Sequence, residues 1–310
     1  MNLAVNLMLT LLLFVSSTAF AYTPNGFELS NLTISQSEIL PGGPGRDGIP
    51  AILEPKFVDG TQAHFMQDTD VVLGIEFSGM TKAYPIKILN WHEIVNDEIE
   101  GQQFMISYCP LCGSGMGFLA GFGEQKKTFG VSGLLYNSDV LMYDHQTESL
   151  WSQIRGSAVS GPLSGQNLIQ YPLKLTRWSQ WIEDHPNTKV LSTDTGFLRD
   201  YSHDPYAGYS DKPHLYFPIS ETTPMSYSMK ETVLGLKGEN RAIAFPFKEL
   251  RLKGESNFKY VFEGVTLTIH WDEENLSAWV TDEQGTLVSS TLLYWFAWHV
   301  FHPETEVYRP

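Results

Sequence analysis

Short runs of alternating apolar and polar residues are the feature that most constrains what this chain can fold into. Examples are VVLGIEF (residues 71–77), QQFMISY (102–108) and YVFEGVTLTIHW (260–271), and Gly, Asn and Asp residues punctuate the chain between such runs. An alternation with a period of two indicates strands. Helical candidates are few: residues 86–97, 177–186 and 290–303. We therefore expect an α+β fold that is mainly β, with short helices.

Two pairs of segments resemble each other within the chain. VVLGIEFSGMTKAYPIKIL (71–89) is similar to TVLGLKGENRAIAFPFKEL (232–250), and RWSQWIEDHPNTKVL (177–191) is similar to YWFAWHVFHPETEVY (294–308). Internal similarity of this kind indicates a repeated unit. We therefore predict two related copies of one unit, of which the second is shorter.

The repeat suggests boundaries for the segments of the chain. An extended lead-in rich in Gly and Pro spans residues 22–60, the first copy spans 61–215, and the second, degenerate copy spans 216–310. In this alignment the second copy has no counterpart of Pro110 through about Leu134. Since a scaffold element would be expected in both copies, this segment is expected to serve function.

The first 21 residues predict export. They form an apolar stretch that ends in Ala19-Phe20-Ala21, the small-x-small pattern of a signal peptide cleavage site. An uncleaved anchor is the alternative, because the segment has no Lys or Arg. We expect a mature chain that starts near Tyr22, has no membrane span, and is periplasmic or secreted. Its formal net charge of −15 argues against nucleic acid as a partner.

The only two cysteines, Cys109 and Cys112, lie in YCPLCGSGMG (residues 108–117), directly after a predicted strand. A disulfide across two intervening residues closes a very short loop and would stabilise the fold little. The same spacing suits thiol–disulfide exchange, in which one sulfur attacks and the other resolves the mixed disulfide. The glycines that follow leave backbone N–H groups accessible, so we expect a cysteine pKa below the usual value.

The spacing of the cysteines also suits two thiolate ligands on one metal ion. His92 in NWHEIVND and His145 in MYDHQTE flank the cysteine segment and are the candidate further ligands. Two sulfurs and one or two imidazoles would suit copper or zinc. Each histidine has an alternative structural role, His92 in helix packing and His145 in a surface turn. Asp139 is a candidate proton acceptor for the cysteine pair.

Several long motifs occur in the same order as in a known family. DGIPAILEPKF, AYPIKILNWHEIVND, YCPLCGSG, FGVSGLLYNSDVLMYDHQTESLWSQ and RDYSHDPYAGY together resemble the family known as domain of unknown function 3179, from about Gly45 to the carboxyl end. The resemblance implies an exported bacterial protein without an assigned activity. Some members of the family are described as selenoproteins, which implies selenium in place of a sulfur in the segment that corresponds to Cys109–Cys112. Selenium there favours a redox role.

Two hypotheses about function follow. In the first, the chain is an exported thiol oxidoreductase without a cofactor. Its catalytic residues are Cys109 and Cys112, with His92, Asp139 or His145 moving a proton, and its partner is an unknown redox protein or small-molecule substrate. In the second, Cys109, Cys112, His92 and His145 bind copper or zinc. A binding module with a static disulfide is a third, weaker option.

Overall fold

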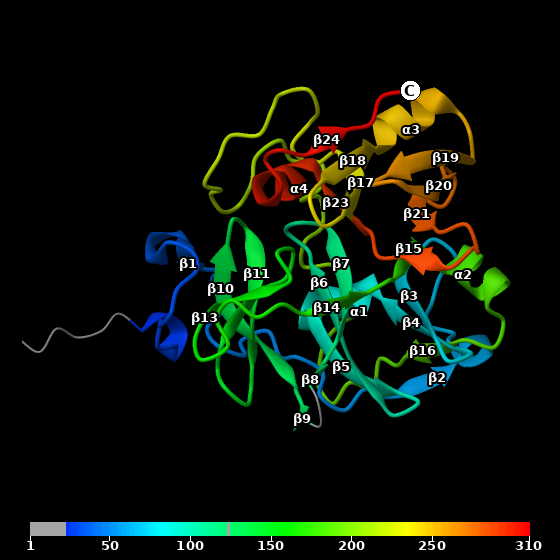
Figure 1. The fold of residues 1–310 in the computed structure, drawn as a ribbon. Coiled ribbons are helices and arrows are strands. Elements are labelled where there is room, and N and C mark those ends of the chain that lie inside the picture. Colours follow the sequence, from blue (N-terminus) through cyan, green and yellow to red (C-terminus); the bar gives the residue numbers. More distant parts are fainter. Residues whose placement is uncertain (1–22, 123–124) are drawn as a thin grey trace, which may run out of the picture.

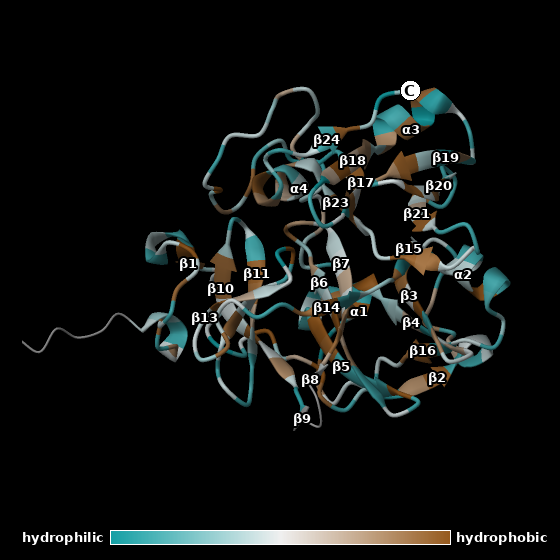
Figure 2. Cartoon of the chain, in the orientation of Figure 1, coloured by the Kyte–Doolittle hydropathy of each residue, from teal (hydrophilic) through white to brown (hydrophobic). Residues whose placement is uncertain are grey.

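Five sheets of four or five strands make up most of this protein in the computed structural model, which describes residues 23–122 and 125–310 (Figure 1). Four short α-helices lie between the strands. The described residues are thus mainly β, in an arrangement of five blade-like sheets that resembles a five-bladed β-propeller. Figure 2 shows hydrophobic residues on many of the strands and mostly hydrophilic residues in the connecting loops.

The strands of each sheet follow in spatial order. The first sheet is β1 (Ile39–Pro41), β10 (Phe129–Tyr136), β11 (Asp139–Asp144), β12 (Leu150–Ser152) and β13 (Ser157–Ser160). The second is β14 (Ile169–Tyr171), β7 (Ser114–Leu119), β6 (Gln102–Cys109) and β5 (Ile94–Ile99). The third is β15 (Lys174–Arg177), β3 (Val71–Phe77), β4 (Met80–Pro85), β16 (Lys189–Leu191) and β2 (Phe57–Asp59).

Two further sheets lie in the carboxyl-terminal part. One is β23 (Thr291–Tyr294), β17 (Thr232–Lys237), β18 (Ala242–Pro246) and β24 (Glu306–Val307), and the other is β19 (Asn257–Phe262), β20 (Val265–Asp272), β21 (Ser277–Thr281) and β22 (Leu287–Val288). A two-stranded ribbon joins β8 (Gly121–Phe122) to β9 (Gln125–Lys126). Neighbouring strands are antiparallel except for the pairs β4–β16 and β18–β24, which are parallel.

The four α-helices are α1 (Ile86–His92), α2 (Trp178–Asp184), α3 (Phe247–Lys253) and α4 (Trp295–Phe301). Short 3₁₀ turns occur at Pro24–Gly26, Gln36–Glu38 and Gly60–Gln62. The sequence predicted α1, α2 and α4 within longer ranges, and α3 was missed. Each helix occupies only part of its predicted range, because the flanking residues belong to strands and turns.

Two-residue turns with positive φ explain several of the hairpins. Ser78-Gly79 joins β3 to β4 and Asn137-Ser138 joins β10 to β11, and both residues of each pair have positive φ. This left-handed turn matches the twist of the adjoining strands. Ser138 therefore holds its backbone in a conformation that non-glycine residues adopt rarely.

The predicted fold of two related copies of one unit is wrong. Sheet membership depends on which strands pair, and the pairing divides the described residues into five sheets, to which the lead-in also contributes β1 and β2. The sequence similarity corresponds to a local motif, a hairpin followed by a helix, which occurs in β3–β4–α1 and in β17–β18–α3. The segment boundaries at residues 60 and 215 stay predictions.

The largest apolar cluster of the described residues lies where the first two sheets meet α4. It includes Cys109 and Cys112, Met142 of β11, and Phe296 and Trp298 of α4. Residues 192–231, all of which the structure describes, form no helix or strand, and they pass beside α4, where Pro224 O accepts a hydrogen bond from Trp295 Nε1 (Figure 1). The cysteine pair thus lies at a junction of several elements.

The predicted signal peptide, residues 1–21, lies outside the described residues. Among the residues that are described, none of the helices has the length and apolar character needed to cross a membrane. Export, and a periplasmic or secreted location, stay predictions.

Candidate functional site

Cys109 and Cys112 lie at one end of the β6–β7 hairpin. Cys109 is the last residue of β6, and Cys112 is in the four-residue turn that leads to β7. The Cys112 N–H donates to the Cys109 carbonyl at 3.2 Å, and the Tyr294 N–H donates to the Cys112 carbonyl at 2.8 Å. Both cysteines are free, and only 1% and 0% of their surfaces are exposed. The turn therefore holds two thiols close together in a buried position.

Gly113 completes this turn in a conformation that requires glycine. Its φ is +62°, and a Cβ atom at this position would lie 3.0 Å from the ring of Tyr294. A side chain here would add backbone strain and press on the tyrosine. The glycine that follows Cys112 in the sequence is thus explained by the turn and by the closeness of Tyr294.

The β10–β11 turn lies against the two sulfur atoms. The carbonyl of Ser138 accepts a hydrogen bond from Cys112 Sγ at 3.4 Å and from Cys109 Sγ at 3.8 Å. A carbonyl only accepts, so both sulfurs donate and are thiols in this arrangement. Ser138 Oγ in turn donates to the carbonyl of Phe217 at 2.8 Å, which ties the turn to the irregular segment 192–231.

Asp139, which follows this turn, has one carboxylate oxygen bonded and one free. Oδ2 accepts hydrogen bonds from Ser152 Oγ at 3.0 Å and from the Ile154 N–H at 3.1 Å. Oδ1 is buried and has no hydrogen-bond partner among the described residues. A carboxylate oxygen of Asp139 and the two Sγ atoms lie within 4.8 Å of one another. Burial raises the pKa of Asp139 to about 7.

Glu93 is a second buried carboxyl near the cysteine pair, and it was not predicted from the sequence. It follows α1 with a φ of +55°, and its Oε1 accepts a hydrogen bond from Tyr206 Oη at 3.4 Å. Burial raises the pKa of Glu93 to about 8, and the nearby charge of Asp139 adds to this effect. In the sequence, the neighbouring His92 was the candidate instead. Only the fold shows that Glu93 faces the interior.

The expectation of a lowered cysteine pKa is wrong for Cys112. Burial raises the pKa of the Cys112 thiol well above its usual value, and Cys109, Asp139 and Glu93 raise it further. A lowered pKa requires N–H groups directed at the sulfur, whereas the groups around the sulfur are a carbonyl and carboxyls. The surroundings thus favour the protonated thiol.

His92 is buried, but both of its ring nitrogens are used elsewhere. Nδ1 lies 2.7 Å from the Pro50 carbonyl and Nε2 lies 2.7 Å from Tyr201 Oη. Since a carbonyl only accepts, Nδ1 carries the proton and Nε2 accepts from the tyrosine. Burial lowers the pKa of His92. His92 lies outside the group formed by the cysteines and Asp139.

His145 also lies outside that group. Its Nδ1 is 2.9 Å from Thr128 Oγ1, and its ring packs edge-on against Tyr143 with a centroid distance of 5.0 Å. It follows β11 in the turn that leads to β12. The structure therefore brings Asp139 to the cysteines and places the two predicted histidines elsewhere.

The three side chains fit a metal ion. Two sulfurs and a carboxylate oxygen of Asp139 form a compact set of ligand atoms, and Asp139 Oδ1 has no hydrogen-bond partner among the described residues. Thiolate and carboxylate ligands are found in zinc sites, and three protein ligands leave a coordination position for water or substrate. Binding would release the thiol protons that now face Ser138. A bound ion would supply Lewis-acid chemistry at this position.

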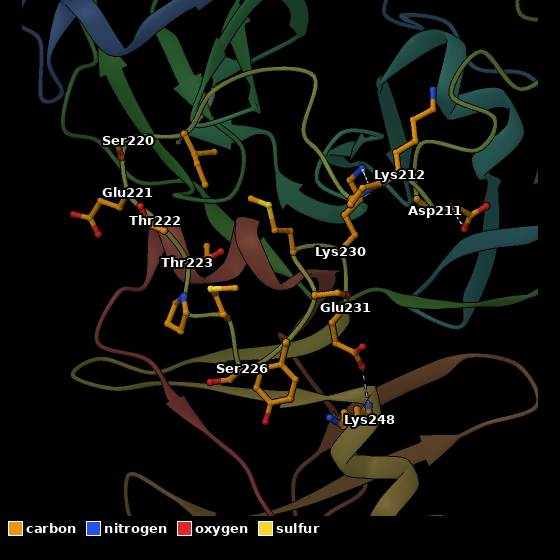
Figure 3. A pocket seen from close by; sticks show the side chains of 18 residues that line it. Asp211, Lys212, Ser220, Glu221, Thr222, Thr223, Ser226, Lys230, Glu231 and Lys248 are labelled. Atoms are coloured by element: carbon orange, nitrogen blue, oxygen red, sulfur yellow. Dashed lines mark hydrogen bonds between the residues drawn. The ribbon is translucent and has the colours of Figure 1, made fainter.

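Two pockets lie near this site. One has a volume of about 580 Å³, and its lining includes Tyr108 and Gly113, which directly precede and follow the cysteine turn. The other has a volume of about 940 Å³ and is lined by residues 210–213 and 219–231 together with Lys248 (Figure 3). Neither cysteine lines either pocket. The smaller pocket is the better candidate for access to the thiols, because the residues on both sides of the cysteine turn line it.

Comparisons with known proteins identify a family and no activity. Residues 46–305 match the model of the family described as "Protein of unknown function (DUF3179)". No curated protein matches the chain, and no solved structure matches it. The family resemblance seen in the motifs is confirmed over most of the chain.

Proposed function

The chain belongs to the DUF3179 family, and we propose that it is an exported thiol-based redox protein in which Cys109 and Cys112 alternate between dithiol and disulfide. One observation carries the proposal: two free thiols of a single turn lie close to a carboxylate oxygen of Asp139, and one oxygen of this carboxyl group, Oδ1, has no hydrogen-bond partner among the described residues. A thiol pair with a nearby proton acceptor is the arrangement that disulfide formation requires.

The proposed reaction consumes one peroxide for each disulfide. The sulfur of Cys109 attacks the peroxide, gives a sulfenic acid and releases an alcohol. The sulfur of Cys112 then displaces water from the sulfenic acid, and the disulfide forms. The two cysteines lose two electrons, the peroxide gains them, and an external thiol reductant returns the pair to the dithiol.

Asp139 is the proposed proton acceptor for the attacking thiol. Its pKa of about 7 is close to neutrality, where a general base is most effective. The raised pKa of Cys112 supports its assignment as the resolving cysteine, which stays protonated until the second step. Because only 1% and 0% of the two cysteines are exposed, a small oxidant suits this site better than a protein disulfide.

Oxidation of the purified mature chain with hydrogen peroxide tests this function. We expect the loss of two thiols and of two hydrogen atoms in the intact mass, both reversed by dithiothreitol. Asp139→Asn should slow the reaction by roughly 100-fold, whereas the exposed control Asp194→Asn should not change it. Over-oxidation of single cysteines without a disulfide would contradict the proposal.

A metal site is the second candidate, favoured by the compact group of Cys109, Cys112 and Asp139. It predicts one equivalent of zinc or copper in protein purified anaerobically, measured by elemental analysis together with thiol counting. Asp139→Ala should lose the metal, whereas His92→Ala should keep it, because His92 lies outside the group. Metal-free protein that forms the disulfide reversibly would exclude this candidate.

A further inference from the structure

The pocket of about 580 Å³ lies between two hairpin turns. Gly113 of the β6–β7 turn lines it, and so do Asn275 and Leu276 of the β20–β21 turn. Tyr108 and Tyr294 also belong to its wall. Tyr108 precedes Cys109, and the Tyr294 N–H bonds to the Cys112 carbonyl. The wall of this pocket, called here the central cleft, is thus continuous with the backbone that carries the thiols.

The central cleft is more positive than the rest of the protein. Its lining contains Arg177, Lys230 and Arg251, and its one carboxylate is Glu231. The whole chain has a formal net charge of −15. A concave region of opposite charge on an acidic protein concentrates anions from solution.

Arg177 is the cation that is free to bind a ligand. Its guanidinium has no ion-pair or hydrogen-bond partner among the described residues, whereas Arg251 Nε pairs with Glu273 at 2.7 Å. Lys230 Nζ donates to the backbone carbonyls of Tyr209, Lys212 and His214. A guanidinium presents two parallel N–H groups that match a carboxylate.

The remaining lining is largely apolar and aromatic. It includes Phe247 and Leu292, which are buried, together with Tyr108 and Tyr294. Pockets for small organic ligands have this composition, and their volumes span about 300–1,000 Å³. The central cleft therefore suits a molecule that has both an apolar body and an anionic group.

We propose that the central cleft binds the substrate of the cysteine pair and selects a small organic anion, whose acid group pairs with Arg177. This inference rests on the proposed redox function. The apolar body of the substrate lies against the tyrosines, and its reactive group faces the turn of Cys109 and Cys112.

Tyr294 closes the route from the central cleft to the thiols. Its ring lies where a Cβ atom on Gly113 would be 3.0 Å away. Burial raises its pKa to about 12, and the nearby thiols Cys112 and Cys109 contribute to the shift. Since the cysteines are almost fully buried, movement of this ring admits the substrate.

Alkylation by two reagents of similar size and different charge tests the inference. Iodoacetate is an anion and iodoacetamide is neutral, and with each the thiolate sulfur displaces iodide and forms a thioether. The measurement is the rate of alkylation by iodoacetate divided by the rate of alkylation by iodoacetamide, for the reduced mature chain. This ratio is then divided by the same ratio measured for glutathione. Arg177→Gln should lower this ratio by roughly tenfold, and Arg177→Lys should restore most of it.

The matched control is Arg241→Gln, which removes an exposed arginine that does not line the central cleft. It should leave the ratio unchanged. Tyr294→Ala should raise both rates by a similar factor, because it opens the route without changing its charge. Circular dichroism establishes that each variant is folded.

An equal ratio in the parent and in Arg177→Gln would overturn the charge selection. Unchanged rates in Tyr294→Ala would overturn the route through the central cleft. Either result leaves the redox function intact if peroxide still forms a reversible disulfide. Conversely, a charge-dependent ratio without disulfide formation would refute the redox function and leave the anion site in place.

Discussion

The hairpins β6–β7 and β20–β21 have turns of the same length with different chemistry. In the first, Cys109 pairs with Ser114 across a four-residue turn, and in the second Asp272 pairs with Ser277 across another. The last turn residue has positive φ in both, +62° at Gly113 and +48° at Leu276. Both turns border the central cleft. A turn of this shape therefore does not depend on cysteine.

The surroundings of the two turns differ more than their backbones. The thiols of the first are buried against the β10–β11 turn and Asp139. In the second, Glu273 and Glu274 are exposed, and Asn275 bonds to Asp272 at its own turn. The second copy was predicted to have no counterpart of Pro110 through about Leu134. This was wrong for the turn itself, because the second hairpin has a four-residue turn of its own. The first hairpin differs from the second in its side chains and in the β10–β11 turn that covers them.

The largest expected effect comes from removing the sulfurs. Cys109→Ser and Cys112→Ser should each abolish reversible disulfide formation, while each lowers the free energy of unfolding by only about 1–2 kcal/mol, because the turn forms without cysteine. Thiol titration and urea unfolding measure the two quantities. The reciprocal variant, Asp272→Cys with Asn275→Cys, should carry thiols that are alkylated faster than the native pair. Global unfolding of the serine variants would break the comparison.

The next effect is a dependence of stability on pH that arises from the carboxyls packed around the first hairpin and not from the second. The folded protein binds the Asp139 proton more tightly than the unfolded chain, since its pKa rises from 3.8 to about 7. The contribution of Asp139 to the free energy of unfolding should therefore be fully present below about pH 4, and about 4 kcal/mol of it should be lost as the pH rises to about 7. Urea unfolding across this range measures it.

Asp139→Asn should remove most of this slope, and Glu93→Gln should remove the part between about pH 4.5 and 8, where the same sign applies because the pKa of Glu93 is also raised. Glu273→Gln, in the exposed turn, is the control and should leave the slope unchanged. The absence of a slope would mean that both carboxyls are solvated in the folded protein.

The smallest effect compares the two left-handed positions. Gly113→Ala should lower the free energy of unfolding by about 2 kcal/mol, from backbone strain and the contact with Tyr294. Leu276→Gly should raise it by up to about 1 kcal/mol, because it relieves strain and 47% of the leucine is already exposed. Thermal unfolding measures both. Equal effects of the same sign would show that the two turns differ in geometry.

Local patterns were sufficient for many elements of the fold. The run at residues 71–77 is β3, and QQFMISY falls within β6. α3 was missed, although it has seven residues and two buried side chains, as the predicted α2 has. The two-copy fold was wrong because a similar hairpin and helix can recur without fixing how many sheets the strands form.

The candidate site was predictable only in part. The spacing singled out Cys109 and Cys112, and Asp139 was considered and lies beside them. His92 was considered because histidine is a common ligand, yet its neighbour Glu93 is the residue whose charge acts on Cys112. A residue directed at the cysteines and one directed away can be adjacent in sequence when a helix ends between them.

The sequence by itself determined the two-residue turns, the strands that alternate, the glycine after the thiols and the short distance between the sulfurs, because each depends on a few consecutive residues. Only the tertiary structure decided that a carboxyl, rather than an imidazole, lies beside the thiols. It also decided that Asp139 and Glu93 retain protons near neutral pH. Proton affinity depends on burial, and burial arises from packing between β6–β7, β10–β11 and the end of α1, which are distant in the chain.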